Sequence, residues 1–318
     1  MREVVPKLIE NGHEVRGVDN YGRYGREAPP AGIEFIKGDL TDTQVVRSAL
    51  RNVDGVIQAA AQIYGVAGFH RYPADILQKD TQLHGLILRE ALEIGIKRVV
   101  YISSSMVYER LADVAREEDV PNMLVPLTDY GLSKLMGERL SQAFAIQNGL
   151  EYTVWRPFNI IGLHERAEGY DPGVCHVFAD FIQRIVHDRQ NPMLILGSGE
   201  QIRCFTWIDD VARAIAQWSF DPATTNQDFN LGNREPVTMI DLAQRIYRLY
   251  HEITGQQITK DLEFTHGETF ADDVLVRIPG VDKAREKLGW EAQVKLDEML
   301  RRCLTHELEQ TSVGAGTA

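Results

Sequence analysis

The segment "KRVVYISSS", residues 97–105, has the composition of a strand buried inside a sheet. Its centre is apolar and β-branched without alternating polar residues, which is typical of a parallel strand covered on both faces. The segment ends in serines, and open α/β folds bind ligands at the carboxyl edge of the sheet. The segment therefore predicts an α/β fold with a parallel sheet, and a ligand-binding site at the carboxyl end of this strand.

Similar strands and helices alternate on both sides of this segment. We expect further strands at residues 13–19, 33–40, 54–61 and 150–157, and helices at 42–52, 73–95 and 129–148. Strand–helix repetition of this kind predicts an α/β fold, a Rossmann-like doubly wound parallel sheet with helices on both faces.

After Pro157 the alternation of strands and helices becomes less regular. Residues 162–173, "GLHERAEGYDPG", read as a loop, and we expect helices near 177–188, 238–251, 282–288 and 296–309. The tail 311–318 is small and polar, so we expect it to be disordered.

The beginning of the sequence departs from a nucleotide-binding βαβ unit. Residues 2–11 read as a helix that leads into the first expected strand, with no strand and glycine-rich turn before it. We expect the first strand of the sheet to be missing because the sequence starts inside a longer protein. The alternative is a genuine loss, which would leave a non-catalytic relative.

Composition narrows the classes of function. The net charge of −12 argues against general nucleic-acid binding, which needs a basic surface. No apolar run reaches the length of a membrane span, and no signal peptide is visible. The three cysteines, Cys175, Cys204 and Cys303, lack the spacing of a metal site or a disulfide framework and favour a reducing cytoplasm.

Tyr130 and Lys134 form a Y-x-x-x-K pair in "DYGLSKLMGE" and share one face of an expected helix. On spacing alone we favour the alternative of a half-buried tyrosine and a solvated lysine. The serines of residues 103–105 strengthen the functional interpretation. A phenolate favoured by a nearby ammonium and a cationic nicotinamide could take a proton from a sugar hydroxyl, while a serine holds the reacting oxygen.

Several polar residues stand where strands end. Asp19 could accept both hydroxyls of a ribose, which favours NAD over NADP, and Asp39 could reach a cofactor; the alternative for both is a turn residue. The small residues 59–61 would let a cofactor approach, or serve close packing. Arg203 and Arg277 could clamp an anion and Asn159 could donate to a phosphate or sugar, although for each arginine alone a surface role is favoured. For Cys175 and His176, packing is favoured over ligand contact.

These motifs agree in order and separation with one family. The matching stretches are "GHEVRGVDN", "GDLTD", "VIQAAAQ", "KRVVYISSSMVY", "YGLSK", "RPFNIIG", "LGSGEQIRCFTWIDDVARAI", "FNLGN" and "VDKAREKLGW". The chain resembles the extended short-chain dehydrogenase/reductases, in particular the NAD-dependent nucleotide-sugar epimerases and dehydratases, including UDP-glucose 4-epimerases.

The resemblance implies a two-part molecule that binds NAD and a nucleotide sugar. Residues 1–157, with 204–235 returning to them, would form the NAD-binding domain, and residues 158–203 and 236–318 the sugar-binding domain. By position, Tyr130 would be the catalytic base, Lys134 its partner and Ser104 the group at the reacting hydroxyl. The implied cofactor-binding residues are Asp19, Asp39, Leu40, Ala60, Ala61, Tyr130 and Lys134, and the implied substrate-binding residues are Ser105, Asn159, Arg203 and Arg277.

The residues after Ser104 indicate the reaction type. Dehydratases of the family carry Asp-Glu there, and a 3,5-epimerase would carry cysteine at the second position, whereas this chain has Ser105 and Met106. The resemblance therefore favours 4-epimerisation of a UDP- or dTDP-linked sugar through a 4-keto intermediate. A 4-keto reductase, a decarboxylase and a non-catalytic relative that binds nucleotide sugar without NAD stay open. The family also implies a cytoplasmic homodimer.

Overall fold

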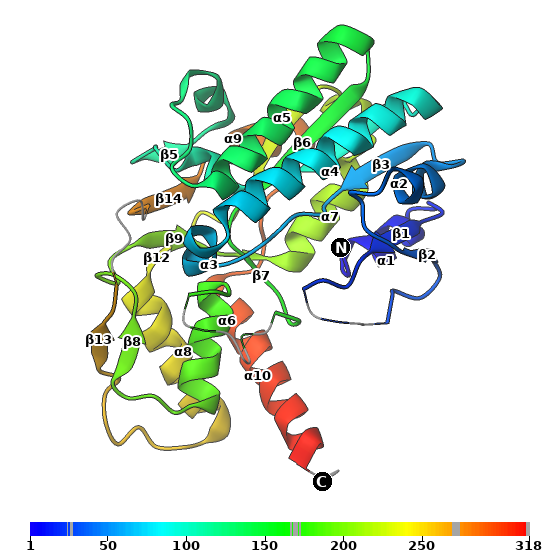
Figure 1. Ribbon diagram of the computed structural model, residues 1–318. Helices are drawn as coiled ribbons and strands as arrows, with labels where there is room; N and C mark the ends of the chain where they lie inside the picture. The colour runs from blue at the N-terminus through cyan, green and yellow to red at the C-terminus, as the bar shows by residue number, and fades with distance from the viewer. Residues whose placement is uncertain are drawn as a thin grey trace.

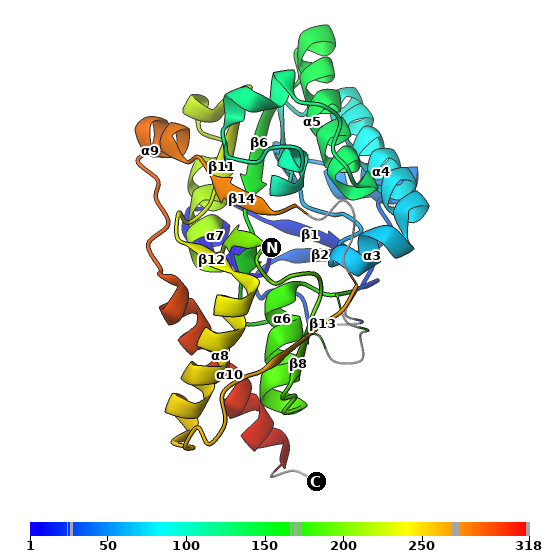
Figure 2. The ribbon, with the colours of Figure 1, turned by 90° about the vertical axis from the view of Figure 1, so that its left-hand side faces the viewer.

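The computed structural model describes residues 1–23, 25, 28–165, 167, 171, 173–268 and 274–315. Two regions are visible in Figure 1: an upper region of strands flanked by long helices, and a lower region that contains α6, α8 and α10. The turned view in Figure 2 shows the same division, with α8 and α10 extending away from the sheet toward the C-terminus.

The central sheet has four parallel strands in the order β11 (Gln227–Leu231), β6 (Glu151–Pro157), β4 (Arg98–Ile102) and β3 (Gly55–Gln58). Two more parallel strands, β1 (Arg16–Asp19) and β2 (Glu34–Lys37), pair only with each other within the described residues. The predicted parallel α/β architecture is confirmed, with the sheet in two pieces.

Consecutive residues of β4 point to opposite faces of the sheet, and both faces are buried. Val99 belongs to a hydrophobic cluster with α2 (Thr43–Leu50) and α4 (Pro73–Ile94). Val100 belongs to a second cluster with α1 (Val4–Glu10), α7 (Ile208–Trp218) and α9 (Asp282–Leu288). Burial on both faces explains why the strand sequence is apolar without alternation.

The helix α5 (Asp129–Asn148) lies beside α4 on the outside of the sheet (Figure 1) and contacts β4 and β6. The side chain of Thr128 caps its N-terminus by accepting from the Gly131 amide, and Gly149 closes its C-terminus in the left-handed conformation. Both caps are readable from the sequence, and the predicted bounds of this helix are confirmed.

The lower region has its own hydrophobic core, built by α6 (Val177–Ile182), α8 (Met239–Thr254) and α10 (Leu296–Ala315). The strands β8 (Met193–Ile195) and β13 (Phe264–His266) pair beside these helices. A four-stranded sheet joins the two regions, in the order β12 (Pro236–Thr238), β9 (Ile202–Cys204), β14 (Val276–Pro279) and β5 (Val114–Ala115). The short strands β7 (Ile160–Ile161) and β10 (Thr206–Trp207) form a further parallel pair.

Three expectations need correction. The helix expected at 177–188 is α6 followed by a wider π-type turn at Gln183–His187. The short helix α3 (Val66–Arg71) was not predicted. Residues 311–315 continue α10, so the expectation of disorder is wrong there, because the apolar face of that helix packs on α8 and propagates the helix to its end. Residues 316–318, and residues 166, 168–170 and 172 of the expected loop, lie outside the described part.

Among the described residues, no helix combines the length and the apolar character needed to cross a bilayer.

Candidate active site

The first turn of α5 is fixed to the segment that follows β4. The Glu109 carboxylate, which is buried, accepts from both the amide and the hydroxyl of Thr128 at 2.7 Å. A Cβ atom at Gly131 would lie 2.7 Å from the carbonyl oxygen of Met106, so only glycine allows this close approach. These contacts set the position of Tyr130, which lies between Thr128 and Gly131 in the chain.

The structure brings Tyr130, Lys134 and Ser104 together. Tyr130 is 7% exposed and Lys134 is 3% exposed, so the alternative of a solvated lysine is wrong. The Lys134 Nζ atom lies 5.7 Å from the centroid of the Tyr130 ring and donates to the carbonyl oxygen of Ile102 at 3.1 Å. The Ser104 hydroxyl accepts from the amide of Met106 and lowers the pKa of the nearby Tyr130 phenol.

The unpredicted helix α3 covers this group. The ring of Phe69 stacks on Tyr130 with a centroid distance of 4.6 Å and an interplanar angle of 7°. The helix is tied to the chain before α6, because the amides of Gly65 and Ala67 donate to the carbonyl oxygens of Val174 and Gly173. A segment from beyond the central sheet therefore helps to exclude water from Tyr130.

The sequence predicts that an ammonium and a cationic nicotinamide together lower the pKa of Tyr130; without the nicotinamide, that pKa is raised. Burial raises the pKa of the Tyr130 phenol, and the Asp80 carboxylate raises it further; the Ser104 hydroxyl and the cations Arg23 and Arg277 oppose this. Burial also lowers the pKa of Lys134. Tyr130 is therefore a neutral phenol in this structure, and a further positive charge is needed to make it a base.

Asp80 is a residue that the sequence interpretation missed. It lies on α4, is 4% exposed, and accepts from the amide of Gln62 at 2.8 Å and from the hydroxyl of Ser133 at 3.3 Å. Asp80 stands four residues after Ile76 and seven before Ile87, both on the buried face of α4. A carboxylate in the apolar stripe of a helix was the signal that could have found it.

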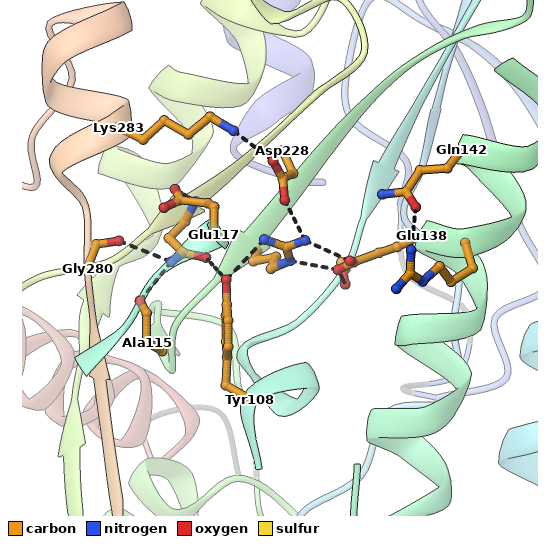
Figure 3. A network of polar contacts seen from close by, with 12 residues as sticks. Tyr108, Ala115, Glu117, Glu138, Gln142, Asp228, Gly280 and Lys283 are labelled. Carbon is orange, nitrogen blue, oxygen red and sulfur yellow. Dashed lines mark hydrogen bonds and ion pairs between the residues drawn. The ribbon is translucent and has the colours of Figure 1, made fainter. Parts of the chain in front are cut away.

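A buried ion-pair network supports α5 from the side of β6 (Figure 3). Arg156 and Glu138 are each 1% exposed and pair at 2.7 Å, and Arg156 also pairs with Asp228. Ser103 donates to the same Glu138 carboxylate. Tyr108 accepts from Arg156 and donates to Asn230. The network joins α5 to the end of β4, where Ser104 follows.

Asp19 and Asp39 lie at the carboxyl ends of the neighbouring parallel strands β1 and β2 and are exposed. Asp19 accepts from the amide of Tyr21, and Asp39 accepts from the amide and hydroxyl of Thr41, which lowers the pKa of Asp39. Both residues shape turns, as the alternative interpretation expects, and both keep a carboxylate at the site edge. Leu40 and Ala60 pack on the hydrophobic cluster under α4, and Ala61 is half-buried.

The two predicted anion-binding arginines are neighbours. Arg277 on β14 lies opposite Arg203 on β9 in the parallel register, and Arg277 is 7% exposed. Asn159 follows β6 with a positive φ of 36° and donates to the carbonyl oxygen of Cys204. Ser105 is buried in the turn after β4. These residues come from different elements, and Arg277 is close enough to influence Tyr130 electrostatically.

The side chain of Cys175 is buried, whereas that of His176 is exposed. His176 bonds to Glu165, and Cys175 is buried, which raises the pKa of its thiol to about 12. Cys204 and Cys303 are also buried and unpaired.

The family described as the NAD dependent epimerase/dehydratase family matches residues 2–232, which is most of the chain. The chain belongs to this family. A UDP-glucose 4-epimerase from Azospirillum brasilense is 27% identical over 98% of this chain and 91% of its own length. A UDP-D-apiose/UDP-D-xylose synthase from rice, Oryza sativa subsp. japonica, is 26% identical over 94% of this chain and 84% of its own.

The fold comparison leads to the same family. The crystal structure of a UDP-glucose 4-epimerase from Thermotoga maritima, solved with UDP-glucose, superposes with a TM-score of 0.81 at 29% identity. The match covers 98% of this chain and 96% of that one. The predicted family and fold class are confirmed.

The cofactor of the epimerase/dehydratase family is NAD, and part of this chain fits it. Exposed carboxylates at two strand ends suit the adenosine, and a buried Tyr–Lys pair suits the nicotinamide ribose. Gln58, the last residue of the edge strand β3, has a buried Oε1 atom without a hydrogen-bond partner among the described residues. The described residues ahead of β1 form only α1, so we assign none of them to the pyrophosphate.

Proposed function

We propose that the protein is an NAD-dependent nucleotide-sugar 4-epimerase. The observation that carries this proposal is the buried group of Tyr130, Lys134 and Ser104, followed by Ser105 and Met106 instead of acids. Such a group can move one proton at one hydroxyl, and it lacks at these positions the acid pair that water elimination requires. The 4-epimerase relatives support this choice.

In this mechanism the chain's residues bind the sugar and move the proton. Tyr130 takes the proton of the C4 hydroxyl, and Ser104 holds the reacting oxygen. Lys134 would hold the nicotinamide ribose beside Tyr130. A bound NAD would supply the hydride acceptor and donor for C4. The covering by Phe69 keeps water from the 4-keto sugar until hydride returns to its other face.

Arg203 and Arg277 would bind the diphosphate, with Asn159 and Ser105 beside the nucleotide sugar. Two neighbouring guanidinium groups suit a diphosphate, because each can donate two parallel hydrogen bonds to phosphate oxygens. The proposed substrates are UDP- or dTDP-linked sugars. We further propose the division into residues 1–157 with 204–235, and 158–203 with 236–318, and a cytoplasmic homodimer.

One observation favours another function. The rice apiose/xylose synthase is a relative at an identity close to that of the epimerase, so another nucleotide-sugar enzyme of the family, a 4-keto reductase or a decarboxylase, is the alternative.

The test is incubation of the purified protein with NAD and, in parallel, UDP-glucose, dTDP-glucose and UDP-glucuronic acid, with products followed by NMR. An equilibrium mixture of 4-epimers without net NADH supports the proposal. Release of CO2, net consumption of NADH or sugar binding without reaction would each replace it by the corresponding alternative. Tyr130→Phe serves as the inactive control.

A further inference from the structure

The ammonium of Lys134 is buried, and its hydrogen bond to Ile102 goes to a neutral carbonyl oxygen. A buried charge is costly unless an opposite charge compensates it. Two carboxylates act on Lys134 electrostatically, those of Asp80 and Glu138.

The Glu138 carboxylate is already paired with another cation. Both of its oxygens accept from the guanidinium of Arg156, at 2.8 and 2.7 Å. The second partner of Arg156 is Asp228, which also pairs with Lys283 at 2.7 Å. Figure 3 shows Glu138, Asp228 and Lys283 in this network. These ion pairs join two cations to two carboxylates, which leaves Asp80 for Lys134.

Asp80 reaches α5 between the two reacting residues. The Ser133 hydroxyl, which precedes Lys134 in the chain, lies 3.3 Å from one Asp80 oxygen and 2.9 Å from the carbonyl oxygen of Tyr130. The other Asp80 oxygen accepts from the Gln62 amide, just after β3. Asp80 is therefore held by groups on two elements, at the turn of α5 that carries Tyr130 and Lys134.

We propose that Asp80 is the counter-ion of Lys134 and a positioning residue for the Tyr130–Lys134 pair, a role that rests on the proposed function. Asp80 keeps Lys134 charged in a dry site and cancels the effect of that charge on Tyr130. The phenol then stays neutral in the free protein, and a bound cationic nicotinamide would add the uncompensated positive charge that favours the phenolate. The base is thereby coupled to cofactor binding.

The other titratable groups around Tyr130 and Lys134 do not take this role. His84 on α4 is neutral, because burial lowers its pKa to about 4. Burial raises the pKa of Tyr101 on β4, so it is a neutral phenol. Arg23, after β1, and Arg277, on β14, are cations. Two carboxylates in the described residues act on Lys134. One of them, Glu138, is paired with Arg156, which leaves Asp80.

The test is an NMR titration of the cofactor-free protein, with Tyr Cζ and Lys Cε labelled by 13C. Tyr130→Phe and Lys134→Met assign the two signals. In Asp80→Asn, the pKa of Lys134 and the pKa of Tyr130 should both fall by about one pH unit or more, because a nearby negative charge is removed. Asp180→Asn is the matched control, since Asp180 is a buried carboxylate paired with Arg184 in the lower region, and it should shift neither pKa.

If either pKa stays unchanged or rises in Asp80→Asn, the counter-ion role is wrong. A reciprocal measurement covers the case in which Asp80→Asn does not fold: Lys134→Met should raise the pKa of the Asp80 carboxyl, followed by 13Cγ, by a similar amount. No rise would overturn the proposal. Neither readout uses turnover, so an absence of epimerase activity would contradict the proposed function and leave the titration to decide this inference separately.

Discussion

Arg203 and Arg277 occupy directly opposite positions of the parallel strands β9 and β14, in the sheet that joins the two regions of the molecule. Like charges on neighbouring strands repel, so such a pair is favourable only with anions near it. A buried carboxylate, Glu109, already acts on Arg277. A diphosphate would add negative charge beside the two guanidinium groups.

Arg277→Met should therefore weaken the binding of UDP by about 10- to 100-fold, the effect of losing a charge-assisted hydrogen bond. Isothermal titration calorimetry would measure the dissociation constant. Arg277→Lys should recover only part of the affinity, because an ammonium cannot donate in the planar fork of a guanidinium. Arg301→Met, on α10, is the control and should leave UDP affinity unchanged; equal affinity for Arg277→Met would remove this arginine from the substrate site.

Phe69→Ala should lower the pKa of Tyr130 toward its ordinary value of about 10, because water would replace the stacked ring. The 13Cζ titration of Tyr130 would report the change. Phe144→Ala removes a half-buried ring from α5 at a distance from the site, and should destabilise the protein without moving that pKa. The same shift in both variants would mean that Phe69 has no specific role in covering the phenol.

Glu138→Gln should lower the free energy of unfolding by about 3–5 kcal/mol, because the Arg156 charge would stay buried without its main partner. Urea unfolding would measure the loss. Glu298→Gln removes an exposed partner of Arg302 and should cost at most about 1 kcal/mol. A loss below that level for Glu138→Gln would show that Asp228 alone compensates Arg156.

The burial of His84 predicts that the free energy of unfolding depends on pH. Burial lowers its pKa to about 4, and its Nε2 atom faces the carbonyl oxygen of Gly137 at 2.9 Å. The unfolded chain takes up this proton near pH 6.5, whereas the folded protein takes it up only near pH 4. The contribution of His84 to the free energy of unfolding is therefore fully present above about pH 6.5. It falls by roughly 3 kcal/mol as the pH drops to about 4.

The measurement is urea unfolding of the wild type and of His84→Gln at about pH 7.5 and pH 4.5. The wild type should lose more stability between these values than the variant does. Equal losses would show that His84 does not titrate in this range.

The elements that the sequence predicted well carry their own local signals. The bounds of α5 follow from its caps, the end of α9 follows from Gly289, and β4 follows from its buried apolar run. Helix α3 could not be predicted in this way, because backbone hydrogen bonds from a segment about 100 residues further along the chain hold its six residues.

The candidate site likewise has one part that local sequence patterns predict and another that long-range contacts determine. The pattern of Tyr130, Lys134 and Ser104 is local to two neighbouring elements, so the sequence predicted the group that the structure brings together. Asp80 was readable from its place in the apolar stripe of α4 but was missed. The neutral state of Tyr130 depends on burial by α3 and on Asp80, which are long-range features that the local pattern does not show.

The central claim, reversible oxidation at C4 by the Tyr130 site, is tested most directly with UDP-glucose that carries deuterium at C4. The protein is incubated with NAD, and the UDP-sugars are separated and examined by NMR and mass spectrometry. The account predicts a 4-epimer that retains deuterium at C4, and a loss of at least about 100-fold in rate for Tyr130→Phe. Deuterium lost to water or moved to C6, or an unchanged rate in Tyr130→Phe, would contradict it.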